Sequence, residues 1–181
     1  GIVLTEEELD EYGDELGRWD GPDATPCGLA WDGTTLYNSS HYGAVCFELD
    51  LDGNNLGQFN LPGTYCFDLA FDGENLWHAR YNPHTVYKLD MDGNVLLTIT
   101  SITGPEGVAT DGNVVWVSSI STNIIYVLDM EGNIIDSFPT PGSSIAGLAY
   151  GCDGYLWAAS QSDPIYQIQT DGTLVLSLIH I

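Results

Sequence analysis

The sequence predicts an all-β fold built from repeated four-stranded sheets, and two repeated blocks lead to this prediction. A first block, which joins a strand to an Asp-Gly-type turn, begins at Gly28, Asp68, Gly107 and Gly147. A second block recurs in step with it and begins at Phe47, Tyr87, Tyr126 and Tyr166. No segment shows the amphipathic period of a helix long enough to bridge parallel strands. Four short antiparallel strands in a repeat of about 40 residues are typical of a β-propeller blade.

The first complete unit shows how each blade divides into strands. The inner strand, Gly-Leu-Ala-Trp, ends at Asp32-Gly33, and the second strand covers residues 35–39. The third strand covers residues 44–50 and the fourth residues 56–60, with an Asp-Gly-Asn turn between them. Such turns predict hairpins because Gly and Asn tolerate positive φ. The same division predicts one domain, 1–181, with blades at 28–61, 67–100, 106–138 and 146–179.

Residues 1–20 are predicted to form the outer half of a further blade. Gly13 lies one repeat length before Gly53, so residues 9–13 align with the end of a third strand and residues 16–19 with a fourth. The segment from Thr5 to Glu8 also fits a capping box that begins a short helix. The expected architecture is therefore a β-propeller with four complete blades plus an N-terminal outer half-blade.

The charge balance excludes two classes of partner. The chain has 3 Lys and Arg against 26 Asp and Glu, which gives a formal charge of −23. Nucleic acids and anionic membrane surfaces are bound by clustered cationic side chains, and Arg18, Arg80 and Lys88 lie apart in the sequence. No apolar run approaches the roughly 18 residues of a membrane helix, so we expect no membrane insertion.

The blade motif resembles that of secreted six- to eight-bladed propellers of the NHL, streptogramin-lyase-like and glutaminyl-cyclotransferase-like group. In these proteins an inner strand that ends in Asp-Gly is followed by a Leu-Trp strand, and the resemblance covers residues 13–178. It implies the fold but no single activity, since such propellers include lyases, cyclases, sensors and adhesive modules. Lyase-type members use a His with a metal-binding acid in the central funnel. No residue here can be matched to that site, which argues against an enzyme.

Alternating strand direction divides the turns between two faces. The first and third turns of each blade form one face, which should be strongly acidic, and the second turns and the links between blades form the other, here named the variable face. The acidic turns resemble the start of a calcium loop, so the candidate Ca²⁺ ligands are Asp50, Asp52, Asp90 and Asp92. Hairpin geometry explains these residues without a metal, and no other cofactor is expected.

The variable face carries the candidate ligand-binding residues, which are His41, Tyr42, His78, Arg80, Tyr81 and His84. Three interpretations remain open: ordinary surface histidines, a polar binding site, or catalysis with His as a base or zinc ligand. Asn38-Ser39-Ser40 is a sequon for N-glycosylation in what is expected to be an exposed turn.

The aromatic residues that recur once per blade and the cysteines have separate predicted roles. Rings on the second strands should fill the space between blades; they are Tyr37, Trp77, Trp116 and Trp157.

Cys27 and Cys66 enter adjacent inner strands and are the expected disulfide, with a bridge from Cys46 to Cys66 as the alternative. Cys46 otherwise fits a core position, and Cys152 should be unpaired.

These observations favour an extracellular or surface module that binds a partner or assembles with copies of itself. Secretion is suggested by the even number of cysteines, the sequon and the scarcity of Lys. The partners would be a second copy, another extracellular protein or a glycan. Residues expected at assembly edges are Leu16, Trp19, Leu174 and Leu176. The alternatives are a small-molecule enzyme with its site in the funnel, a self-closed four-bladed ring, and a halophilic cytosolic protein.

Overall fold

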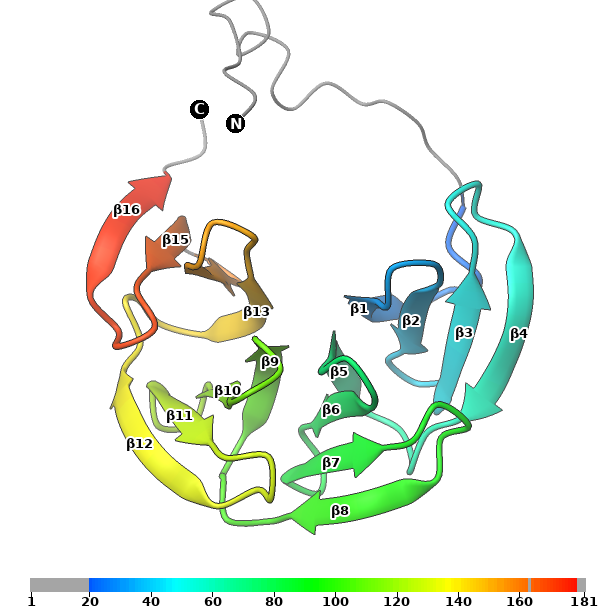
Figure 1. Cartoon of the computed structure of the whole chain (residues 1–181), viewed down its shortest axis with the longest axis horizontal. Helices are drawn as coiled ribbons and strands as arrows, with labels where there is room; N and C mark the ends of the chain where they lie inside the picture. Colours follow the sequence, from blue (N-terminus) through cyan, green and yellow to red (C-terminus); the bar gives the residue numbers. More distant parts are fainter. Residues whose placement is uncertain (1–19, 163, 179–181) are drawn as a thin grey trace, which may run out of the picture.

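A computed structural model of the chain describes residues 20–162 and 164–178. These residues form four four-stranded antiparallel sheets, and in each sheet the strands follow one another in chain order. Figure 1 shows the sheets arranged as blades around a common centre, with the first strand of each blade innermost. The prediction of an all-β propeller with four complete blades is confirmed.

The strands have the following bounds. Blade 1 contains β1 (Pro26–Trp31), β2 (Leu36–Ser40), β3 (Val45–Leu49) and β4 (Asn55–Asn60). Blade 2 contains β5 (Cys66–Phe71), β6 (Leu76–Arg80), β7 (Thr85–Leu89) and β8 (Val95–Ile99). Blade 3 contains β9 (Pro105–Thr110), β10 (Val115–Ser119), β11 (Ile124–Leu128) and β12 (Ile134–Pro139). Blade 4 contains β13 (Ile145–Tyr150), β14 (Leu156–Ser160), β15 (Ile165–Ile168) and β16 (Leu174–Leu178).

The Asp-Gly turns form the hairpins that the sequence predicts. In the third turn of blade 2, Oδ1 of Asp90 accepts bonds from the backbone N–H groups of Asp92 and Asn94, and Oδ2 accepts one from the Asn94 side chain. Gly93 lies in this turn with φ of 84°, a conformation that Gly adopts without steric cost. The turn is therefore specified locally, within each blade.

The four blades form an open arc. Inner strand β5 packs beside β1 and beside β9, and β13 packs beside β9. Figure 1 shows that blade 4 and blade 1 stand apart across an opening in the ring. The chain therefore has two end blades, each with one sheet face that no other described blade covers.

Three hydrophobic clusters hold the arc together, one at each junction between consecutive blades. Each junction pairs two kinds of face. The front face is here the one toward the preceding blade, and the back face is the one toward the following blade. At the junction of blades 2 and 3, Ala70, Trp77 and Val86 from a back face pack with Val108 and Val115 from a front face.

The predicted packing of the recurring aromatic rings is confirmed at the junctions. Tyr37, Trp77 and Trp116 are buried between blades, whereas Trp157 on the back face of blade 4 is only half-buried. The predicted N-terminal half-blade, including Leu16 and Trp19, lies outside the described residues. Within the part of the chain that is described, no helix has the length and apolar character needed to cross a membrane.

Candidate functional site

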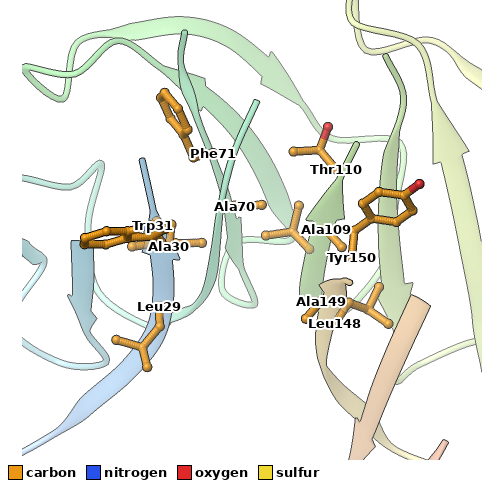
Figure 2. A pocket seen from close by; sticks show the side chains of 12 residues that line it. Leu29, Ala30, Trp31, Ala70, Phe71, Ala109, Thr110, Leu148, Ala149 and Tyr150 are labelled. Carbon is orange, nitrogen blue, oxygen red and sulfur yellow. The ribbon is translucent and has the colours of Figure 1, made fainter. Parts of the chain in front are cut away.

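The inner strands surround a central cavity of about 360 Å³ near the acidic-turn end of the channel. Figure 2 shows side chains from all four inner strands around it, among them Trp31, Phe71, Thr110 and Tyr150. Its lining is made of apolar side chains, strand backbone and the hydroxyl groups of Thr110 and Tyr150. This end of the channel offers few groups for chemistry.

A single carboxylate, Asp68 on β5, ties three blades together across the channel. Its Oδ2 accepts a hydrogen bond from the Val108 N–H of blade 3 at 2.9 Å and from the Leu148 N–H of blade 4 at 3.2 Å. Its Oδ1 accepts one from the Leu69 N–H at 3.0 Å. Burial raises the pKa of Asp68 to about 7, although the three N–H donors favour the charged form.

Asp68 occupies a repeat position at which the other three blades have Gly28, Gly107 and Gly147. A Cβ at Gly28 would lie 2.5 Å from the Asp68 Cα, and one at Gly107 would lie 2.9 Å from the Leu148 nitrogen. Glycine at these two positions is thus required for the close approach of the inner strands, and only β5 carries a side chain at this level.

The variable-face end of the channel opens into a second cavity, of about 500 Å³. Cys27, Phe67, Asp68 and Gln161 are among the residues that line it. The Gln161 side chain donates to Oε2 of Glu106 at 3.2 Å, and burial raises the pKa of Glu106 to about 7. Burial also raises the pKa of the Cys27 thiol to about 11, and the charges of Asp68 and Glu106 act in the same direction. Asp68 therefore lines the channel mouth, and the buried Glu106 is bonded to Gln161, which lines it too.

Beside this mouth, blades 1 and 2 build an aromatic cluster from His41, Tyr42, Tyr65, Phe67, Tyr81 and His84. The His41 ring lies 4.3 Å from the ring of Tyr42, 5.7 Å from that of Tyr65 and 4.7 Å from that of Phe67, each near perpendicular. Phe67 continues to Tyr81 at 6.0 Å, and Tyr81 to His84 at 5.3 Å. Because Phe67 also lines the 500 Å³ cavity, the cluster and the channel mouth form one surface.

Hydrogen bonds fix the cluster to the backbone. The His41 carbonyl accepts bonds from the N–H groups of Tyr65 at 2.7 Å and Cys66 at 3.2 Å, and the His41 Nδ1 lies 3.0 Å from the Cys66 carbonyl. Tyr65 has φ of 63°, in the left-handed region, where a bulky side chain is strained. At the same repeat position, blades 3 and 4 carry Gly104 and Ser144, also with positive φ. Strain of this kind persists where the surroundings impose it.

Four of the six predicted ligand-binding residues, His41, Tyr42, Tyr81 and His84, thus belong to the cluster. His78 does not: it is fully buried at the junction of blades 1 and 2, its Nδ1 lies 3.2 Å from the Asp68 carbonyl, and burial lowers its pKa to about 4. β6 runs on past His78 to Arg80, so the His78 side chain points between the sheets. Arg80 lies beside the cluster, where its Nε donates to the Thr64 carbonyl at 2.8 Å.

The calcium candidates lie in hairpin turns, as the sequence predicts. In blade 1, Oδ1 of Asp50 accepts bonds from the N–H groups of Asp52 and Asn54, and Oδ2 accepts one from the Asn54 side chain. These bonds lower the pKa of Asp50, and Asp90 has the same arrangement. No group of three or more metal-ligating side chains is found among residues 20–162 and 164–178.

Two other site predictions do not match the structure. Cys27 and Cys66 are free thiols, as are Cys46 and Cys152, so neither the predicted bridge nor its alternative is formed. The Cys66 thiol instead donates to the Gly63 carbonyl at 3.0 Å. Asn38 is not in an exposed turn, because β2 extends through Ser40. Its side chain is 3% exposed and donates to the Gly28 carbonyl, so the sequon is inaccessible in the folded chain.

The predicted assembly residues on β16 are exposed, Leu174 at 51% and Leu176 at 44%. Exposed apolar residues occur on the outer strands of the other blades too, which carry Leu56, Leu96 and Ile135. Exposure on this strand therefore does not distinguish blade 4, and the prediction for these two residues stays a prediction.

Sequence reasoning missed Tyr65, Phe67, Asp68 and Glu106. A departure from the repeat would have found one of them, since Asp68 stands where the other three blades have Gly. The repeat positions of Tyr65, Phe67 and Glu106 carry a different residue in each blade, so the repeat does not mark these three residues.

The fold has solved counterparts among enzymes. The chain is 22% identical to a streptogramin B lyase, with a TM-score of 0.62 over 85% of this chain and 54% of the lyase chain. It is 16% identical to the glutaminyl cyclase of Myxococcus xanthus, with a TM-score of 0.74 over 86% of this chain and 70% of the cyclase. The chain therefore spans about half the length of the lyase. At these identities the likeness shows that this chain shares the β-propeller fold of the lyase and the cyclase, and it shows no activity.

A designed protein has a similar extent. The chain is 16% identical to the computationally designed Ika4 protein, with a TM-score of 0.62 over 87% of this chain and 98% of the designed one. No protein-family model matches the sequence, and no curated protein matches it.

Proposed function

We propose that the protein is a binding module whose recognition site is the aromatic cluster together with the adjoining channel mouth, and that its ligand is an organic cation. The observation that carries the proposal is Tyr65, a strained aromatic residue at a position where other blades have Gly104 and Ser144. A left-handed conformation costs a bulky residue about 1–2 kcal/mol. Blade 2 places a partly exposed aromatic ring at this left-handed position, in contact with His41 and Tyr42, and a role in binding would explain it.

Three further observations favour a cation. Tyr42 and Tyr65 expose 59% and 39% of their surfaces, and the π-face of such rings attracts ammonium groups. Asp68 lines the adjoining mouth, and Glu106 is bonded to Gln161, which also lines it. The formal charge of −23 attracts cations over the whole surface and repels anionic ligands. The guanidinium of Arg80, which lies beside the cluster, donates its Nε–H to the backbone carbonyl of Thr64.

Titration calorimetry with benzyltrimethylammonium as the probe tests the proposal. We expect saturable binding that weakens with added salt, and an affinity at least about 10-fold lower for Tyr42→Ala and for Tyr65→Gly. Tyr65→Gly should remain folded because Gly suits the left-handed position. Ser144→Gly is the matched control, since it makes the same backbone change in blade 4 without removing a ring.

Two outcomes contradict the proposal. Failure of the cation to bind at millimolar concentration would exclude the proposal. An affinity that is the same for the unaltered chain, Tyr42→Ala and Tyr65→Gly would exclude it too. Saturable binding of a neutral oligosaccharide such as cellotetraose, without binding of the cation, would instead identify the cluster as a glycan site.

A second candidate function, catalysis on a small molecule, is favoured by one observation. Asp68 and Glu106 have pKa values raised to about 7, and such groups serve as acids and bases at neutral pH. The three backbone bonds to Asp68 give it a structural role, so Glu106 is the better candidate. Turnover of an amine substrate that Glu106→Gln abolishes without weakening substrate binding would favour the enzyme over the binding module.

A further inference from the structure

Each internal junction is covered at its outer edge by a residue near the end of the fourth strand of the preceding blade. Each of these residues packs in or against the cluster of its junction and lies over the third-turn glycine of the following blade. The pairs are Phe59 with Gly93, Ile99 with Gly132, and Phe138 with Gly172. A Cβ on these glycines would lie between 2.4 and 2.8 Å from the side chain over it. Figure 1 shows the ends of β4, β8 and β12 beside these turns, so the contact recurs at all three junctions.

Blade 1 has the receiving half of the same contact. Its third turn makes the same hydrogen bonds as that of blade 2, and Gly53 stands at the repeat position of the three glycines. Leu51 in this turn is 66% exposed, whereas its counterparts Met91 and Met130 pack against the junction clusters. No described blade precedes blade 1, so no described blade supplies this turn with the apolar residue that the other three turns receive.

The described segment that leads into blade 1 has the hydrogen bonding of a link between blades. The His41 N–H donates to the Thr25 carbonyl at 2.8 Å. At the internal links the corresponding bonds, of 3.1 or 3.2 Å, join Tyr81 to Tyr65, Ile120 to Gly104 and Gln161 to Ser144. Each internal link follows the fourth strand of the preceding blade. The segment into blade 1 is therefore built to follow a fourth strand as well.

The residues just before this segment match the end of a fourth strand in sequence. Phe59 and Pro62 form an aromatic-x-x-Pro pattern at one internal link, and Phe138 begins the same pattern at another. Trp19 begins it again with Pro22, and Trp19 stands 40 residues before Phe59. Trp19 therefore occupies the repeat position of the three residues that pack on the following blade.

The start of the described chain lies on the front face of blade 1. Gly21 and Pro22 line a cavity of about 290 Å³ on this face together with Leu36 and Leu49. Leu49 ends β3 and so adjoins the third turn. A side chain two positions before Gly21 is within reach of this turn, since consecutive Cα atoms are about 3.8 Å apart.

We propose that the front face of blade 1 is the docking surface for this chain's own residues 9–19, with the Trp19 indole over Gly53 as Phe59 lies over Gly93. The occupant is this segment because its sequence aligns with the outer two strands of a blade and joins the face directly at Gly21. An outer hairpin covers the outer part of the face and leaves the inner part, with Leu29, open. Trp19 then serves its own chain and not an edge between copies.

A double-mutant cycle in the full chain tests the proposal. Trp19→Ala should lower the unfolding temperature by about 4–8 °C and Leu51→Ala by about 2–4 °C. The double variant should lose clearly less than the sum of the two losses, because residues in contact are coupled. Leu96→Ala is the matched control for Leu51→Ala, since Leu96 is 54% exposed on the outer strand β8. Its loss should add to that of Trp19→Ala.

Fluorine NMR locates the ring directly. In the full chain labelled with 5-fluorotryptophan, Trp19→Phe identifies the resonance of Trp19. We expect Leu51→Ala to shift this resonance. Ile165→Ala, on the open back face of blade 4, should leave it unchanged. Dilution should leave it unchanged too, because the proposed contact lies within one chain.

Three results would overturn the proposal. Additive losses in the cycle, with a Trp19 resonance at its position in the urea-unfolded chain, would show that the ring is not packed. A resonance that responds to Ile165→Ala and not to Leu51→Ala would assign the segment to blade 4. A response to Leu51→Ala that disappears on dilution would assign the contact to the same segment of a second copy.

Discussion

The junction between blades 2 and 3 and the open front face of blade 1 use the same repeat positions but have opposite environments. Val108 is fully buried at the junction, while Leu29, its counterpart in blade 1, is 55% exposed. The sheets have the same strand order and closely similar turns. The difference teaches that a blade determines its own sheet but not the burial of its faces, which depends on its neighbours.

The largest expected effect tests this comparison with two tryptophans at one repeat position. Trp116 is 2% exposed and stacks on Tyr150 at 5.5 Å between ring centres, so Trp116→Ala should cost about 3–5 kcal/mol of unfolding free energy. Trp157→Ala on the open face of blade 4 should cost less than half as much in dilute monomer. Urea unfolding measures both, and equal losses would mean that blade 4 is covered like an internal blade.

A second prediction compares the carboxylates of the channel with those of the turns through their pH dependence. The folded pKa of Asp68, about 7, lies above its ordinary value of 3.8, so the folded state binds more protons than the unfolded state between these values. Its contribution to stability should therefore fall as pH rises from about 4 to 7. Asp68→Asn, which resembles the protonated form, should reduce this slope without abolishing it, because the pKa of Glu106 is also raised to about 7.

Turn carboxylates supply the opposite sign as a control. Hydrogen bonds within the turn lower the pKa of Asp50, so its contribution is present at neutral pH and is lost as pH falls below its ordinary pKa. Asp50→Asn should therefore alter stability at neutral pH and leave the slope between about pH 4 and 7 unchanged. Thermal unfolding across pH measures both, and a parallel profile for Asp68→Asn and the unaltered chain would refute the assignment to Asp68.

The smallest expected effect concerns the hairpin turns, which should not distinguish end blades from internal ones. Asp50 in blade 1 and Asp90 in blade 2 make the same bonds to the backbone and to the Asn side chain of their own turns. Asp50→Ala and Asp90→Ala should therefore lower the unfolding temperature slightly and equally. A clearly larger loss for Asp90 would show that turn stability depends on the neighbouring blade.

Most of the fold could be predicted because its signals are local. Asp-Gly turns fix the hairpins, alternating apolar residues fix the sheet faces, and the recurrence of the two blocks fixes the number of blades. The site was predicted only in part. His41 and Tyr81 were expected on one face, and the structure brings them into one cluster. His78 was placed on that face and Asn38 in a turn, both wrongly, because the end of a strand has no sharp sequence signal.

The sequence by itself determined the four sheets, their turns and the aromatic rings between them, since hydrogen bonds and side-chain alternation within a single repeat specify each blade. Only the tertiary structure decided which faces are covered, that Asp68 bonds to blades 3 and 4, and that Tyr65 meets His41. The physical reason is that these contacts join residues far apart in the chain, where distance depends on how one blade packs on the next. The repeat determines which residues each blade carries on its faces, and the packing of one blade on the next determines which residues those faces contact.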